Sequence, residues 1–196
     1  MLACAAVILF LLDASASINE KHWQDMIRGH AEALVSERVL KVIEGDGPIA
    51  IGVYAFSDSV EPMMHFRLLQ SPADARTAAN DLNRVERPFS LGTRAGLALE
   101  HAVKVMETEA PCESHNLLID LVSDGESYDE YLAERARDRA QDLSIRINVL
   151  GVGRIAADWL NNHAKTSTGF YMQIDSMDDI IPSLQRKIVR ELASSN

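Results

Sequence analysis

The feature that most constrains this chain is an alternation of short apolar runs with longer segments of helical periodicity. Four runs rich in Val, Ile, Leu and Phe read as strands buried on both faces, and they cover residues 5–12, 49–56, 117–122 and 145–152. A shorter fifth run covers residues 170–174. Apolar side chains recur at helical steps of three and four in residues 19–43, 72–85, 94–107, 129–142, 156–165 and 177–192. Strand and helix therefore alternate throughout.

Residues 60–69 form the exception, because only the short turn Ser57-Asp58-Ser59 separates them from the preceding strand. Such a turn permits an antiparallel hairpin, whereas a parallel return needs about a dozen residues or more. The sequence thus predicts an α/β fold with an open, doubly wound, mostly parallel sheet, one antiparallel edge strand and helices on both faces. We expect a single domain over residues 1–196.

Composition narrows the classes of partner. The 196 residues are 47% hydrophobic and 24% charged, which is typical of a globular domain. The 19 Lys and Arg against 29 Asp and Glu give a net charge of -10, which repels nucleic-acid phosphates and anionic lipid surfaces. We therefore expect no nucleic-acid partner, and a cation or a basic partner suits this charge better.

The uncharged residues 1–12 could be taken for a leader peptide. No Lys or Arg precedes them, and they are too few for a membrane span, which needs roughly 20 residues. The one A-x-A-like cleavage site nearby, Ala14-Ser15-Ala16, would remove Asp13, the first residue of a D-x-S-x-S segment of oxygen-bearing side chains. A buried first strand is favoured over a removable leader, and any export signal is expected upstream.

Oxygen-bearing side chains follow two of the predicted strands and precede one helix. The first strand ends in Asp13, with Ser15 and Ser17 at alternate positions; Asp124 follows the fourth strand, and Thr93 precedes a helix. Alone, D-x-S-x-S is an ordinary turn or helix-cap pattern. Its position differs here, because ligands of open α/β sheets bind beyond the carboxyl ends of the strands. Hydroxyl and carboxylate oxygens favour Mg²⁺, Mn²⁺ or Ca²⁺ over zinc or copper.

The D-x-S-x-S, G-T and S-D-G segments in this order resemble the von Willebrand factor A (vWA) domain and its metal-ion-dependent adhesion site (MIDAS). The resemblance covers nearly the whole chain and implies a role for each residue. It implies that Ser15 and Ser17 bind the cation directly and that Asp13 acts through water or a serine hydroxyl. Thr93 matches a threonine that ligates in the ligand-competent state, and Asp124 matches an aspartate that binds directly or through water.

This resemblance implies an adhesion or scaffold module without catalytic residues. A divalent cation, Mg²⁺ or else Mn²⁺ or Ca²⁺, would remain short of ligands and accept a Glu or Asp carboxylate of a partner protein. Ala16 departs from the pattern, since the family commonly has glycine there. A methyl group fits if the backbone keeps a negative φ.

The two cysteines, Cys4 and Cys112, are too few for a zinc ribbon and could form one disulfide or remain buried thiols. In the vWA-like fold they would lie near the amino ends of neighbouring strands, where a disulfide is plausible. The arrangement resembles a group of bacterial, generally exported vWA-like proteins. It favours a periplasmic or extracellular location, with a cytoplasmic one left open.

Three other interpretations remain. Residues 151–156 match G-x-G-x-x-A after a strand, which imitates a dinucleotide-binding fingerprint, although such a fingerprint normally opens its fold. Asp13 after an apolar strand could serve a metal-dependent hydrolase or phosphatase, but these usually carry a second aspartate where Ser15 stands. The third is a vWA fold whose metal site is vestigial.

Overall fold

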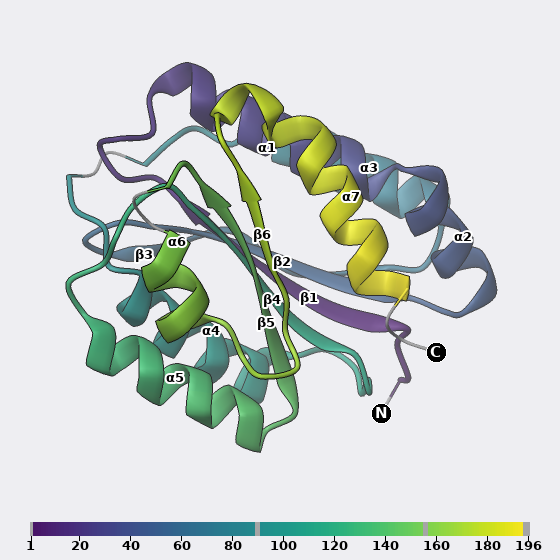
Figure 1. Ribbon diagram of the computed structural model, residues 1–196. Helices are drawn as coiled ribbons and strands as arrows, with labels where there is room; N and C mark the ends of the chain where they lie inside the picture. The colour runs from purple at the N-terminus through teal and green to yellow at the C-terminus, as the bar shows by residue number, and fades with distance from the viewer. Residues whose placement is uncertain (1, 89–90, 155–156, 194–196) are drawn as a thin grey trace.

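The centre of the fold is strand β1 (Ala6–Asp13), all eight residues of which are buried. The computed structural model describes residues 2–88, 91–154 and 157–193 (Figure 1). Its sheet has the order β3-β2-β1-β4-β5-β6. The other strands are β2 (Ile49–Phe56), β3 (Val60–Leu69), β4 (Leu117–Ser123), β5 (Ile145–Val152) and β6 (Tyr171–Ile174). Among the strands in these described residues only β3 pairs antiparallel with its neighbour, so the predicted fold class and edge strand are confirmed.

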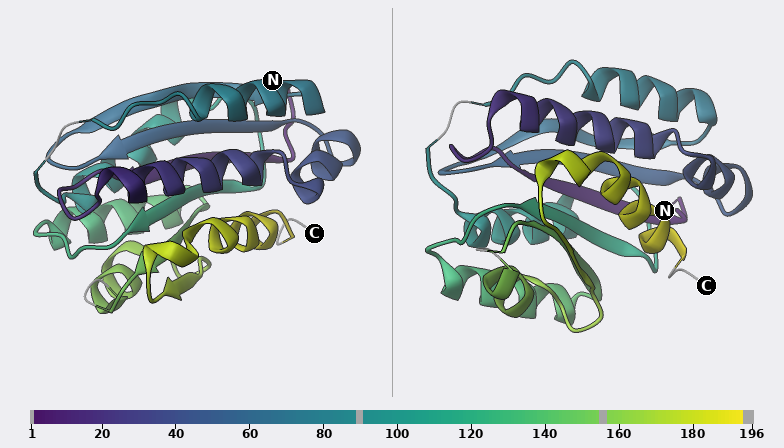
Figure 2. Two further views of the ribbon diagram at one scale, coloured as in Figure 1. Left: turned by 90° about the horizontal axis from the view of Figure 1, so that it is seen from above. Right: turned by 45° about the horizontal axis from the view of Figure 1, so that its top comes forward.

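Helices cover both faces of the sheet, because alternate residues of the central strands point to opposite sides (Figure 2). Phe10 packs against one group of helices and Leu11 against the other. The first group is α1 (Glu20–Leu34), α2 (Glu37–Gly45), α3 (Pro72–Leu82) and α7 (Ile180–Ala193); the second is α4 (Ala95–Glu109), α5 (Glu130–Asp142) and α6 (Ala157–Trp159). No helix in these described ranges has the length and apolarity needed to cross a bilayer.

Two predicted helices differ from the structure. Residues 19–43, expected as one helix, are two, because Ser36 has an extended backbone and its hydroxyl accepts a hydrogen bond from Val39 N to begin α2. The helix expected over residues 156–165 is the short α6 followed by a π-helical turn, η1 (Leu160–Ala164). Residue 156, the first of that segment, lies outside the described part of the chain.

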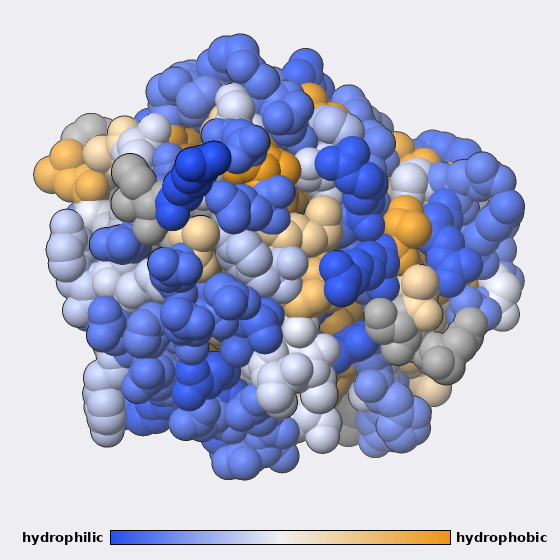
Figure 3. Space-filling view, in the orientation of Figure 1, coloured by the Kyte–Doolittle hydropathy of each residue, from blue (hydrophilic) through white to orange (hydrophobic). Residues whose placement is uncertain are grey.

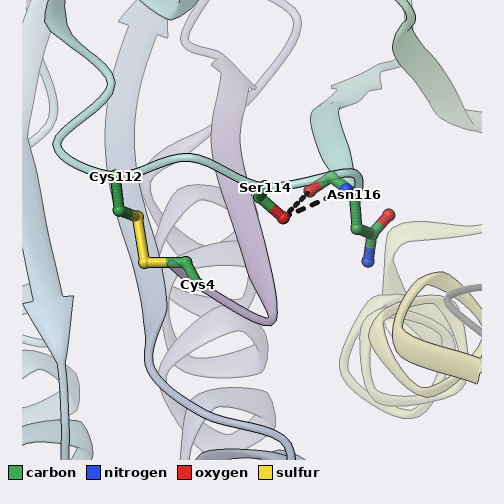
Figure 4. The surroundings of a disulfide bond; sticks show 4 residues. All are labelled: Cys4, Cys112, Ser114 and Asn116. Atoms are coloured by element: carbon green, nitrogen blue, oxygen red, sulfur yellow. Dashed lines mark hydrogen bonds between the residues drawn. A yellow bond between two sulfur atoms is a disulfide. The ribbon is translucent and has the colours of Figure 1, made fainter. Parts of the chain in front are cut away.

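A disulfide joins Cys4, just before β1, to Cys112 in the loop between α4 and β4 (Figure 4). Beside it, the Cys4 amide donates to the Glu113 carbonyl at 2.9 Å. The same loop continues to Ser114, whose hydroxyl accepts from Asn116 N at 3.0 Å just before β4 begins. The disulfide, one of the two alternatives for these cysteines, therefore fastens the amino-terminal edge of the sheet.

A fully buried charged cluster joins helix α7 to the sheet. The ammonium of Lys187 contacts the carboxylate of Asp120 on β4 and lies 3.1 Å from Glu191 Oε1. Asn148 on β5 donates to the same Glu191 oxygen at 3.0 Å. Burial, together with the nearby negative charge of Asp120, raises the pKa of Glu191 to about 8. This cluster is not evident from the sequence, because Asp120 lies inside an apolar run.

Candidate metal site

The candidate site lies where the direction of strand order reverses. From β1 the chain adds β2 and β3 toward one edge of the sheet, and from β4 it adds β5 and β6 toward the other. Strands β1 and β4 are adjacent and parallel, with Leu12 opposite Val122, so the loops that follow them leave the same edge side by side. Ligands of open α/β sheets bind at such a switch point.

Asp13 ends β1 as a fully buried carboxylate. Its Oδ1 accepts a hydrogen bond from Ser15 N at 2.8 Å, and its Oδ2 accepts from the Ser123 hydroxyl at 2.5 Å. Burial raises the pKa of Asp13 to about 6 despite these hydrogen bonds, and the charge of Asp124 adds to the increase. Asp13 thus holds the loops after β1 and β4 together, and a cation nearby would favour its ionised form.

The oxygens of Ser15, Ser17 and Asp124 come together in front of Asp13. The hydroxyls of Ser15 and Ser17 lie 3.1 Å apart, and Ser17 Oγ donates to Asp124 Oδ1 at 2.7 Å. Ser15 is buried and Ser17 is exposed, so the group opens toward solvent. An octahedral Mg²⁺ site with bonds of about 2.0–2.1 Å places neighbouring oxygens about 2.9 Å apart. These separations therefore fit a small hard cation.

Thr93 lies at the border of this group. A Cβ atom built on Gly125 would lie 3.4 Å from Thr93 Oγ1, which places the threonine hydroxyl beside the loop that carries Asp124. Its hydroxyl makes no hydrogen bond to Ser15, Ser17 or Asp124 within the described part of the chain. The structure therefore joins four of the five predicted residues through hydrogen bonds and leaves Thr93 adjacent.

The chemistry of the donor set also decides what the site can hold. Within residues 2–88, 91–154 and 157–193, no three His, Cys, Asp or Glu side chains form a group able to hold a metal. The donors available here are hydroxyls and two carboxylates, which suit Mg²⁺, Mn²⁺ or Ca²⁺ better than a softer ion. Such a set neutralises a divalent cation only in part if Asp13 acts through water or serine.

Sequence reasoning missed two residues that position Thr93. The hydroxyl of Ser127 lies 3.1 Å from the Thr93 carbonyl oxygen and accepts from Ala95 N at 2.9 Å. The carboxylate of Asp129 accepts two further amides of the first turn of α4, both at 2.9 Å. The side chain of Asp129 is only 10% exposed, although it begins a segment rich in charged residues. The sequence does contain one hint that a distant side chain caps α4, because Arg94 at the N-cap position of this helix has no side chain suited to capping it.

Two other side chains hold the backbone of the site loops. Arg87 donates through Nη2 to the carbonyl oxygens of Ala14 and Ser15, at 3.0 and 2.6 Å. Asp58, from the β2–β3 turn, accepts the amide of Gly92 at 2.9 Å. Among the described non-glycine residues only Ser144 has a positive φ, so Ala16 has the negative φ that its methyl group requires.

The G-x-G-x-x-A segment has a structural explanation for its glycines. A Cβ atom on Gly151 would lie 2.4 Å from the Tyr171 hydroxyl, so the Tyr171 side chain packs over Gly151 and would have to move for any larger residue. Gly153 has a φ of +73°, a left-handed conformation that favours glycine. Ile155 and Ala156, which complete the pattern, lie outside the described residues.

Comparison with known proteins places this geometry in a family. A family model described as "Protein of unknown function (DUF1194)" matches residues 3–196. The chain belongs to the DUF1194 family. DUF1194 is a bacterial vWA-like family, which agrees with the D-x-S-x-S loop and sheet order described above. No curated protein sequence matches the chain significantly.

Solved vWA structures share the fold of this DUF1194 chain. Proximal thread matrix protein 1 from the mussel byssus, in a form with a zinc-occupied MIDAS motif, is 19% identical with a TM-score of 0.72, covering 98% of this chain and 48% of its own. A von Willebrand factor type A protein from Catenulispora acidiphila is 16% identical with a TM-score of 0.70, and the match covers 96% of this chain and 43% of that protein. BatB from Bacteroides thetaiotaomicron is 16% identical with a TM-score of 0.69, and the match covers 97% of this chain and 98% of that protein. The chain thus spans about half the length of the mussel protein and has the vWA fold.

Proposed function

We propose that this protein is a divalent-metal-dependent protein-binding module, an adhesion or scaffold domain that coordinates an acidic residue of a partner through a MIDAS-type site. The site would consist of Asp13, Ser15, Ser17, Thr93 and Asp124. The observation that carries the proposal is the convergence of the two serine hydroxyls and the Asp124 carboxylate at 3.1 and 2.7 Å.

The residues divide the work according to their burial. Ser15, Ser17 and Asp124 have oxygens that face one another and would hold the cation, Mg²⁺ or else Mn²⁺ or Ca²⁺. Asp13 is fully buried and would fix the loop through Ser15 N and add negative charge behind the serines. Thr93 would complete the group from its border position.

The partner follows from charge. A divalent cation held by neutral hydroxyls and few carboxylates keeps a net positive charge. A carboxylate oxygen from outside the chain can therefore coordinate this cation. The exposed position of Ser17 leaves this side of the site open to a Glu or Asp side chain of another protein. The rest of the surface is acidic, with a net charge of -10, so a carboxylate is attracted only where the cation is bound.

We also propose an exported protein, in the periplasm or outside the cell. The disulfide between Cys4 and Cys112 supports this location, because disulfides persist in oxidising compartments and are rare in the cytosol.

Thermal unfolding in Mg²⁺ or Mn²⁺ and in EDTA tests the metal site. A cation at a hundred times its dissociation constant should stabilise the protein by about 2.7 kcal/mol. Asp124→Asn should lose this response, whereas Asp138→Asn, which removes an exposed carboxylate from α5, should keep it. A wild-type protein without any metal response would indicate a vestigial site, and phosphate release from a generic ester in Mg²⁺ would indicate a hydrolase instead.

A further inference from the structure

Large apolar side chains that are exposed gather near the candidate metal site. In the part of the chain that the structure describes, five such residues stand out: Leu2, Leu91, Tyr128, Tyr131 and Val189. Three of them, Leu91, Tyr128 and Tyr131, lie on the two segments that bring Thr93 and Asp124 to the site. Single exposed apolar residues are normal on a protein surface, but their concentration beside one site marks an interaction surface.

Leu91 and Tyr128 border the metal site. Leu91 is 71% exposed and lies two residues before Thr93, and Tyr128 is 95% exposed and lies four residues after Asp124. The neighbouring Ser127 hydroxyl lies 3.1 Å from the Thr93 carbonyl, so both segments run beside Thr93. In Figure 3 an apolar protrusion lies at the left edge of the molecule, on the side where β1 ends in Figure 1.

The backbone around these two side chains is anchored. Tyr128 stands between Ser127 and Asp129, and both neighbours bind amides at the start of α4. The amide of Gly92, directly after Leu91, is held by Asp58 at 2.9 Å. A partner that packs on these side chains therefore meets a backbone that is held on both sides of Tyr128 and directly after Leu91, which favours binding. Tyrosine in particular offers a large contact area at low entropic cost.

Tyr131 is a weaker candidate for contact with a partner protein, because the guanidinium of Arg135 lies over its ring at 5.8 Å from the centroid. The Arg135 guanidinium also contacts the carboxylate of Glu100 on α4. Tyr131 thus already has a partner within the chain, whereas Leu91 and Tyr128 project from loops.

We infer that Leu91 and Tyr128 form an apolar rim of the metal site, and that the partner is a protein segment in which a large apolar side chain lies close to the coordinating Asp or Glu. This inference rests on the proposed function and adds the chemistry that selects the partner. The metal would bind the carboxylate, and the apolar rim would bind its neighbour. A second copy of this chain fits poorly, because two molecules of charge -10 repel each other.

Selection from a phage library of random linear peptides tests the inference. The full chain is immobilised in Mg²⁺, and bound phage are eluted with EDTA. Three proteins are compared: the wild type, the double variant Leu91→Ser/Tyr128→Ser, and the control Leu2→Ser, which removes an exposed leucine before the opposite end of β1. Thermal unfolding confirms that each is folded.

The wild type and Leu2→Ser should enrich Asp or Glu with Phe, Tyr, Trp or Leu within a few positions. The double variant should still enrich the acidic residue, while the apolar residues return to their frequency in the library. A selected peptide should bind the double variant on the order of tenfold more weakly than the wild type. The Mn²⁺ affinity of all three proteins should be equal.

Two results would overturn the inference. One is a wild-type selection of acidic peptides without apolar neighbours, which leaves the proposed function intact. The other is an unchanged apolar preference in the double variant. If the wild-type protein shows neither a metal response nor peptides released by EDTA, the proposed function fails and this inference fails with it.

Discussion

The hydroxyl of Ser17 lies 2.7 Å from the carboxylate of Asp124, although 107 positions separate the two residues in the sequence. This contact exists because β1 and β4 are parallel neighbours whose ends are in register. Behind it, the Asp13 carboxylate accepts the Ser123 hydroxyl at 2.5 Å, so the same two loops are joined a second time in the interior. The candidate site is therefore built where these loops are held together.

Ser17→Ala should remove the metal response with little effect on the metal-free protein. Ser17 is exposed, so removal of its hydroxyl should change the free energy of unfolding in EDTA by no more than about 0.5 kcal/mol. Its hydroxyl is one of the three converging oxygens, so Mn²⁺ affinity should fall. Calorimetric Mn²⁺ titration measures this, with Thr108→Ala, an exposed hydroxyl on α4, as the control. Equal affinities for wild type and Ser17→Ala would contradict the assignment.

Asp13→Ala should destabilise the protein even without metal. The substitution leaves the Ser15 amide and the Ser123 hydroxyl without their buried acceptor, which should cost about 1–3 kcal/mol. Asp124→Asn should not have this effect, because an asparagine oxygen can still accept from Ser17 and neither buried hydrogen bond to Asp13 is lost. Urea unfolding in EDTA separates the two variants, and equal stability of Asp13→Ala and wild type would show that the carboxylate does not hold the loops.

The fold and the chemical type of the site can be predicted from the sequence because both depend on patterns within short segments of the chain. Apolar runs such as residues 145–152 are too short for a typical helix and are typical of strands buried on both faces, and the turn before residues 60–69 is too short for a parallel return. The positions of Asp13 and Asp124 after their strands place both at one edge. These inferences need only periodicity and the handedness of connections.

What sequence reasoning missed depends on tertiary contacts. Asp129 reads as part of a charged helix, but it caps α4 from a distance of more than 30 positions. Lys187 and Glu191 read as ordinary helix-surface residues, and only the packing of α7 on the sheet buries them against Asp120. The break between α1 and α2 depends on the cap at Ser36 rather than on a helix-breaking residue.

Lys187→Met should be strongly destabilising. It leaves the Asp120 carboxylate buried without its cation, and breaking a buried pair in this way typically costs about 3–5 kcal/mol. The double variant Lys187→Met/Asp120→Val, which removes both charges, should recover most of that loss. Urea unfolding of both variants provides the measurement. A double variant as unstable as the single one would mean that packing, not charge, sets the cost.

Stability should fall as the pH rises from about 4.5 toward 8. The pKa of Glu191 is raised from 4.5 to about 8 by burial and the charge of Asp120, so the native state keeps a proton that the unfolded chain releases. The stabilising contribution is complete below pH 4.5 and is lost as the pH approaches 8. Burial lowers the pKa of His30 below 6.5 and raises that of Asp13 to about 6, so the titrations of these two groups fade above pH 6.5 while that of Glu191 continues.

Glu191→Gln should therefore flatten the dependence of unfolding free energy on pH between 6.5 and 8. Urea unfolding at several pH values in this range makes the comparison, with Glu44→Gln, an exposed residue of α2, as the matched control. A slope that is the same in Glu191→Gln and wild type would mean that Glu191 does not carry the proton.

Replacing both cysteines by alanine should destabilise the protein without changing its metal response. The disulfide closes a loop with a sequence separation of 108, for which the loss of chain entropy in the unfolded state predicts a cost of roughly 4–5 kcal/mol. Cys4 and Cys112 lie at the amino-terminal edge of the sheet, at the opposite end of β1 from Asp13. Urea unfolding and Mn²⁺ titration of Cys4→Ala/Cys112→Ala test both statements, and a changed Mn²⁺ affinity would contradict the second.

The most direct test of the metal site is a crystal structure of the protein grown with Mn²⁺, with the ion located by its anomalous scattering. We predict a single strong anomalous peak for a Mn²⁺ ion that is bonded to the hydroxyls of Ser15 and Ser17, and to Asp124 directly or through one water. A peak at any other group of residues, or well-ordered serines with no peak between them at saturating Mn²⁺, would contradict a metal-dependent binding module.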